Sequence, residues 1–240
     1  MKLWIENTSE MLATVVAEYI AEYIRRHPDA LMCFAAGDTP LKMLMKLVQI
    51  QACGEVNLAS VRYVGLDEWQ GISYETKGSC CQVMRDCFYT PAGIPEDRMR
   101  LWNGRAENPQ AECARMNAWI EHCGGIGLAL LGIGMNGHIG FNEPGAPMDL
   151  PCHIVALDQV TAEVGRKYFD GAVCSDYGMT IGMPWLLESD ETFLMATGTH
   201  KAPIVRKAVI DSVSLEVPAS QLQKHPKLTV CLDHNVWQNL

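Results

Sequence analysis

The chain has 240 residues, a length that favours one large domain or two small ones. Hydrophobic residues make up 48% and charged residues 20%, a balance that excludes collagen-like and disordered classes and leaves an ordinary globular protein. The net charge of −9, with no run of Lys and Arg, excludes nucleic acid as an expected partner.

The spacing of apolar residues changes several times along the chain. From Thr8 to Arg26 they recur at helical spacing, with Thr8 or Ser9 placed to cap the first turn. Short apolar runs that end at glycine or at acidic residues predict buried strands, and the periodic segments between them predict helices. The expected strands cover 30–36, 61–66, 126–133 and 192–196, and the expected helices cover 40–48, 79–89, 109–123 and 201–211.

Strands that alternate with helices in this way predict a parallel sheet with right-handed crossovers and helices on both faces. We therefore expect an α/β fold of the doubly wound, Rossmann-like type with a mainly parallel sheet. No linker, low-complexity tract or internal repeat interrupts the sequence, so residues 1–240 are expected to form a single domain. The periodicity lapses within residues 145–177, where we expect a mobile lid.

Targeting signals and cysteines indicate the compartment. No apolar stretch is long enough to span a bilayer, and the first residues lack the apolar core of a signal peptide, so we expect a cytoplasmic protein without a membrane partner. In such a chain the ten cysteines are expected to be reduced and mostly buried. Their spacing does not match a zinc site, and we expect no metal.

In open α/β sheets, ligands bind beyond the carboxyl ends of the strands, so the residues after each apolar run are candidates for a site. The first junction holds Gly37, Asp38 and Thr39, and its glycine and the N–H groups of the next helix suit a phosphate. A plain turn, with Thr39 as helix cap and Pro40 in the first helical position, is the simpler alternative. At the last junction Lys201 begins a helix, where a lysine is unfavourable unless an anion lies nearby.

The two middle junctions carry groups that can transfer protons. Asp67 and Glu68 follow the second strand, and one of them could serve as a base, although adjacent acids are more often solvated loop residues. The stretch 132–145 combines several glycines with His138 and Glu143. Histidine both takes and gives a proton near neutral pH, which favours a functional role over a structural histidine that caps a turn.

These junctions together resemble the glucosamine-6-phosphate deaminase/isomerase family, from about residue 35 to the end of the chain. The strongest match is Gly-His-Ile-Gly-Phe-Asn-Glu-Pro at 137–144, and Leu-Asp-Glu-Trp at 66–69 and Gly-Asp-Thr-Pro at 37–40 follow in the family's order and spacing. The resemblance implies a Rossmann-like enzyme that converts an amino-sugar 6-phosphate to a ketose 6-phosphate and ammonia, without a metal or organic cofactor.

The resemblance also implies a role for each candidate residue. His138, held by Glu143, would open the sugar ring, and Asp67 would take the proton from C2 and return one at C1. The implied ligands of the substrate and its phosphate are Gly37, Asp38, Thr39, Gly137, Lys201 and either Arg166 or Lys167.

Asn136 stands where members that act on glucosamine 6-phosphate usually carry Asp, which favours the galactosamine-6-phosphate branch. As a further catalytic candidate, Asn136 would either orient His138 or bind the C4 hydroxyl of the substrate. The alternatives are a 6-phosphogluconolactonase-like hydrolase and a non-catalytic sugar-phosphate-binding protein, against which Asp67 and the sequence Asn-Glu-Pro at 142–144 favour the deaminase. Both a monomer and a homo-oligomer are compatible with this sequence.

Overall fold

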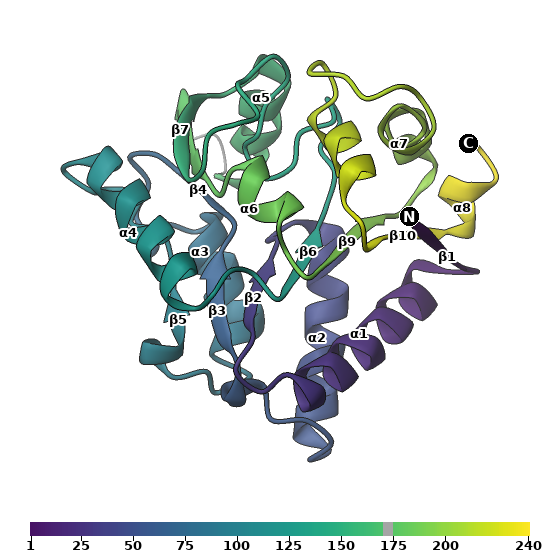
Figure 1. Ribbon diagram of the computed structural model, residues 1–240, viewed down its shortest axis with the longest axis horizontal. Helices are drawn as coiled ribbons and strands as arrows, with labels where there is room; N and C mark the ends of the chain where they lie inside the picture. Colours follow the sequence, from purple (N-terminus) through teal and green to yellow (C-terminus); the bar gives the residue numbers. More distant parts are fainter. Residues whose placement is uncertain (170–174) are drawn as a thin grey trace.

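The computed structural model describes residues 1–169 and 175–240, with the side chain of Lys167 outside that description. Its centre is a seven-stranded sheet in the order β1-β10-β9-β6-β2-β3-β5, in which every neighbouring pair is parallel (Figure 1). The strands of this sheet are β1 (Lys2–Glu6), β2 (Leu31–Phe34), β3 (Arg62–Gly65), β5 (Met99–Arg100), β6 (Leu128–Leu131), β9 (Glu191–Ala196) and β10 (Leu228–Asp233).

Helices connect the strands and cover the sheet. They are α1 (Ser9–Arg26), α2 (Asp38–Ala52), α3 (Cys80–Met84), α4 (Pro109–His122), α5 (Gln159–Tyr168), α6 (Met183–Leu187), α7 (Ala202–Val209) and α8 (His234–Trp237). The short helical segments are η1 (Leu58–Ser60), η2 (Arg85–Tyr89), η3 (Glu96–Arg98), η4 (Thr199–Lys201) and η5 (Pro218–Lys224).

The two faces of the sheet bury separate hydrophobic cores, because successive strand side chains point to opposite faces. In β2, Met32 and Phe34 pack with helices α1 and α2, whereas Leu31 and Cys33 pack with α4, α6 and α7. All four side chains are almost fully buried. This arrangement confirms the doubly wound α/β fold with helices on both faces.

A second sheet departs from the predicted pattern. Strands β4 (Asp67–Trp69), β8 (Tyr177–Thr180) and β7 (His153–Ala156) form an antiparallel sheet in the order β4-β8-β7. The chain leaves the parallel sheet after β3 and enters the small sheet directly, so the acids at 67–68 lie in a strand rather than in a loop.

Helix ends follow the predicted capping in one case and not in another. Thr8 caps α1 by accepting a hydrogen bond from the N–H of Met11, as predicted. The simpler alternative for the first junction is wrong: α2 begins at Asp38, with Gly37 in the cap position and no side-chain cap, instead of starting at Pro40 behind Thr39. The helix can start before Pro40 because the first N–H groups of a helix have no intrahelical partner, so a proline in the first turn removes no hydrogen bond.

Within the described residues, no helix is both long and apolar enough to cross a membrane.

Candidate functional site

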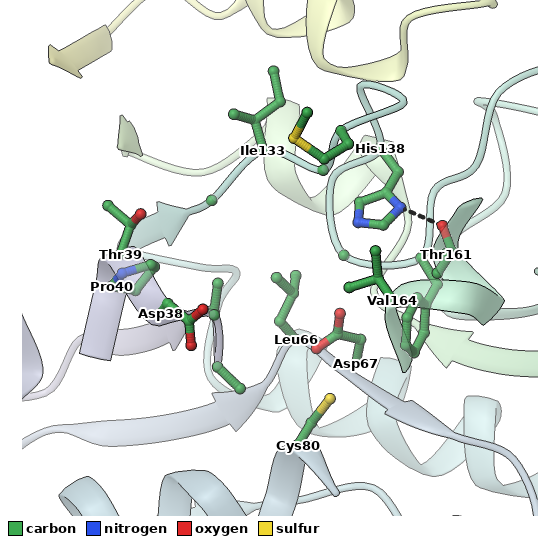
Figure 2. A pocket seen from close by; sticks show the side chains of 18 of the residues that line it. Asp38, Thr39, Pro40, Leu66, Asp67, Cys80, Ile133, His138, Thr161 and Val164 are labelled. Carbon is green, nitrogen blue, oxygen red and sulfur yellow. Dashed lines mark hydrogen bonds between the residues drawn. The ribbon is translucent and has the colours of Figure 1, made fainter. Parts of the chain in front are cut away.

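The four predicted junctions meet at one cavity of about 520 Å³ beyond the carboxyl ends of the parallel strands (Figure 2). Its walls come from most, though not all, residues of four segments: 35–41 after β2, 66–69 after β3, 132–141 after β6, and 195–201 at the end of β9. A further wall comes from helix α5, through side chains that include Thr161, Val164 and Tyr168. The volume suits a small ligand.

Asp67 is the acid of the second junction that reaches the cavity. Burial raises its pKa to about 7, and the neighbouring Glu68 carboxylate adds to that rise. His138 and a hydrogen bond from the Cys80 thiol act in the opposite direction, favouring the charged form of Asp67. A carboxyl group with a pKa near neutrality is suited to taking up and returning a proton.

Glu68 has a structural role instead. Successive side chains of a strand point to opposite faces, so the Glu68 side chain points away from the cavity that Asp67 reaches. It is completely buried. Oε1 accepts hydrogen bonds from the N–H groups of Trp69 at 2.9 Å and Cys80 at 3.1 Å, and Oε2 accepts one from Cys81 at 2.9 Å. Glu68 therefore fixes the start of α3 beside β4. Of the two acids, Asp67 is the one whose position in the cavity allows it to act as a base.

The raised pKa of Asp67 has a consequence for stability that does not depend on function. Between pH 4 and pH 7 the native chain holds a proton on Asp67 that the unfolded chain has lost, so this residue makes stability fall as pH rises. We expect Asp67→Asn, which imitates the protonated acid, to be more stable than the wild type at pH 8 by roughly 2–4 kcal/mol. The gain should disappear near pH 4.

Urea unfolding of both proteins at several pH values measures this difference. Asp38→Asn is the matched control, because Asp38 lines the same cavity but is exposed. A gain for Asp67→Asn that stays constant with pH would show that burial does not destabilise the charged form.

His138 is held at Nδ1 by several groups. The hydroxyl of Thr161 lies 2.9 Å from Nδ1 and Oε2 of Glu143 lies 3.4 Å from it. Asn136 joins these partners: its Nδ2 donates to Glu143 Oε2 at 2.9 Å and to Thr161 Oγ1 at 3.4 Å, and its Oδ1 accepts from the N–H of His138 at 3.2 Å. Figure 2 shows the other ring nitrogen of His138 turned towards the cavity that Asp67 also lines.

Glycines let the loop after β6 fold tightly around this histidine. A Cβ atom on Gly134 would lie 2.3 Å from Cδ2 of His138, so only glycine lets the ring pack there. Gly137 has a φ of +89° and packs against Val217. It is absent from the described lining of the cavity, so the structure does not bring this predicted ligand into the site.

The far end of the cavity suits an anion. The uncapped N-terminus of α2 brings Gly37, Asp38 and Thr39 to the cavity, and Thr39 exchanges a hydrogen bond of 3.1 Å with Thr197. Lys201 also lines the cavity and donates from Nζ to the carbonyl of Ile133 at 2.6 Å. Burial lowers the pKa of Lys201, and the Asp38 carboxylate acts against that change. An ammonium has three donors, so Lys201 can bind an anion while it keeps this contact.

The remaining predicted ligands lie on α5. Arg166 is exposed and does not belong to the described lining of the cavity, and the side chain of Lys167 lies outside the described residues. The residue that sequence reasoning missed on this helix is Thr161, which is 4% exposed. A signal for the helix itself was present: Asp158 caps it, and Val160 and Val164 are spaced by one turn.

Comparison with known proteins gives a consistent family. The sequence matches the model of the family described as glucosamine-6-phosphate isomerases/6-phosphogluconolactonase over residues 5–231. It is similar to a glucosamine-6-phosphate deaminase of Lysinibacillus sphaericus, with 35% identity over 229 residues that cover 95% of this chain and 97% of the relative. A glucosamine-6-phosphate deaminase of Bacillus velezensis is 36% identical over 225 residues, which cover 93% of each chain.

Solved structures agree with these relatives. The fold is similar to that of a monomeric glucosamine-6-phosphate deaminase, with a TM-score of 0.96, 32% identity and coverage of 100% of both chains. A 6-phosphogluconolactonase from Trypanosoma brucei has a TM-score of 0.76 and 16% identity, covering 100% of this chain and 98% of its own. The second similarity extends to the fold alone.

Proposed function

This chain belongs to the family of glucosamine-6-phosphate isomerases and 6-phosphogluconolactonases, and we propose that it converts an amino-sugar 6-phosphate to a ketose 6-phosphate and ammonia. The proposal rests on one observation, namely that three kinds of group line the same cavity. They are a carboxyl group with a pKa near 7, a histidine whose Nδ1 is hydrogen-bonded to the protein, and groups at the start of α2 that suit an anion. The identity of 35–36% with glucosamine-6-phosphate deaminases over nearly the whole chain supports it.

The proposed reaction needs two proton-transfer steps. His138 takes the proton of the anomeric hydroxyl and returns it to the ring oxygen, which opens the sugar. The Glu143 carboxylate, 3.4 Å from Nδ1, stabilises the imidazolium that forms in between. Asp67 then takes the proton from C2 and returns it at C1, while O1 gains the proton that the ammonium group at C2 gives up, which leaves an iminium group at C2. Water adds to this carbon and ammonia leaves, so that C2 becomes the ketone. In this scheme the reaction needs no metal or organic cofactor.

The phosphate group occupies the other end of the cavity in this proposal. It accepts hydrogen bonds from the N–H groups at the start of α2 and from Lys201. Asp38 is the unfavourable group there, because its carboxylate repels an anion.

The direct test measures ammonia release from galactosamine 6-phosphate and glucosamine 6-phosphate side by side. We expect one ketose 6-phosphate for each ammonia with at least one of these epimers. An asparagine at position 136 resembles the galactosamine-6-phosphate branch of the family, whereas the relatives named above are glucosamine-6-phosphate deaminases. Absence of ammonia with both sugars would contradict the proposal. Hydrolysis of 6-phosphogluconolactone would then support the hydrolase, and binding without turnover would support the non-catalytic alternative.

Lys201→Ala tests the position of the phosphate. A charge-assisted hydrogen bond contributes about 1.5–3 kcal/mol, so its loss should raise KM by at least about tenfold and leave kcat within about threefold of the wild type. Steady-state kinetics of ammonia release measure both constants. Lys42→Ala is the control, because Lys42 lies on α2 but pairs with Glu10 at the surface. An unchanged KM for Lys201→Ala would place the phosphate elsewhere.

Asn136→Asp separates the two roles open to this residue. Both ends of the amide already bind protein groups, namely Glu143 and Thr161 through Nδ2 and the His138 N–H through Oδ1. We therefore infer that Asn136 orients His138 and does not select the epimer. Aspartate at this position would put a second carboxylate about 2.9 Å from that of Glu143, and such a pair shares a proton near neutral pH.

The expected result is a kcat reduced roughly tenfold and an acid limb of the pH–rate profile moved to higher pH. The ratio of kcat/KM for the two epimers should stay within about twofold. A changed ratio with an unchanged pH profile would instead assign the amide to the C4 hydroxyl.

A further inference from the structure

Thr161 is the nearest hydrogen-bond partner of His138. Its Oγ1 lies 2.9 Å from Nδ1 of the ring (Figure 2). Oε2 of Glu143 lies 3.4 Å from the same nitrogen. The threonine side chain comes from α5, whereas the histidine lies in the glycine-rich loop after β6. Thr161 is nearly completely buried, so water does not replace this contact.

The surrounding donors and acceptors decide which ring nitrogen holds the proton of neutral His138. Asn136 Nδ2 donates to both Thr161 Oγ1 and Glu143 Oε2, so these two oxygens act as acceptors. An ionised carboxylate can only accept, and a threonine oxygen has a second lone pair with which to accept again. Nδ1 faces both oxygens, which favours the tautomer with the proton on Nδ1. Nε2 then faces the cavity with a lone pair.

We infer that Thr161 is the positioning residue of His138: its hydroxyl accepts the Nδ1–H bond and holds the ring so that Nε2 is the base that faces the substrate. This inference rests on the proposed function for its kinetic consequences. In this chain the neutral pair Asn136 and Thr161 fixes the orientation of the ring, and Glu143 supplies the charge.

The location of Thr161 couples the histidine to the wall of the cavity. Val160, Val164 and Tyr168 line the cavity from the same helix. A displacement of α5 would therefore remove both part of the substrate-facing wall and the nearest partner of Nδ1. The orientation of His138 therefore depends in part on the packing of α5 against the site.

Nitrogen NMR of ¹⁵N-histidine-labelled protein tests the tautomer without any substrate. The chain has seven histidines, and comparison with His138→Asn assigns the signals of the ring in question. At a pH where this ring is neutral, we expect the wild type and Thr161→Ser to hold the proton on Nδ1. Thr161→Val keeps the shape of the side chain and removes the acceptor, so it should shift the population towards Nε2–H. A wild-type ring protonated on Nε2, or no change in Thr161→Val, would overturn the inference.

Kinetics provide the second measurement. Loss of one hydrogen bond that orients a catalytic group should lower kcat of Thr161→Val by about tenfold, with KM within about twofold, and Thr161→Ser should restore most of it. Thr14→Val is the matched control, because the Thr14 hydroxyl donates to the carbonyl of Glu10 on its own helix, away from the residues that line the cavity. Melting curves exclude unfolding as the cause. Equal kcat for Thr161→Val and the wild type would overturn the positioning role. If the wild type releases no ammonia from either sugar, the proposed function fails, and the NMR result still decides the role of Thr161.

Discussion

Asp67→Asn is expected to lower kcat for ammonia release by about 10²–10⁴-fold, the contribution of a general base to catalysis. The amide keeps the shape of the carboxyl group but cannot take the proton from C2. Substrate binding should remain, because the phosphate end and the His138 group lie on other elements. Ring opening by His138 should also remain, so the variant separates the two proton-transfer steps.

Proton NMR in D₂O distinguishes these steps. With Asp67→Asn, we expect catalysed interconversion of the α and β anomers of the substrate and almost no ketose product. Asp38→Asn is the matched control, since it removes a carboxylate from the same cavity and should keep turnover. A turnover of Asp67→Asn above about half the wild-type value would contradict the assignment, because general-base catalysis accounts for far more than twofold.

The parts of the fold that could be predicted are those with strong local signals. The buried runs that form β2, β6 and β9 are apolar on both faces. The start of α1 is marked by Thr8, because threonine is a common N-cap residue. Because parallel strands end at a common edge, these three strands and the strand expected at 61–66 already place the four junctions together. The cavity is therefore largely predictable once the strands are known.

The small antiparallel sheet could not be predicted in the same way. Its strands have three or four residues, too few to show an alternation of apolar and polar side chains. Shifting a strand by one residue exchanges its two faces, so Asp67 and Glu68 could not be told apart without the pairing of β4 with β8. Thr161 was missed for a related reason: its contact with His138 joins residues 23 positions apart, and local sequence patterns do not record such contacts.

His138→Asn is expected to lower kcat/KM for the cyclic substrate by about 10²–10³-fold. Asparagine has a similar reach but cannot carry a proton from the anomeric hydroxyl to the ring oxygen. The loss should be smaller than complete, because a small fraction of the sugar opens in water and can still reach Asp67. Lys201 and the start of α2 are unchanged, so affinity for the phosphate group should be kept.

The two variants should give different results in the same NMR experiment. With His138→Asn, anomer interconversion should fall to the uncatalysed rate, and the little ketose that forms should carry deuterium at C1, because Asp67 still exchanges its proton with solvent. His122→Asn is the control, since that histidine stacks on Trp119 at the end of α4. Anomer interconversion at the wild-type rate in His138→Asn would assign ring opening to another group. If Asp67→Asn were the variant that lost interconversion, the roles of the two residues would have to be exchanged.

The double variant Asp67→Asn/His138→Asn tests whether ring opening and C2 proton transfer are separate steps. If they are separate, the rate of ammonia release by the double variant should equal that of the slower single variant, because only the slowest step limits turnover.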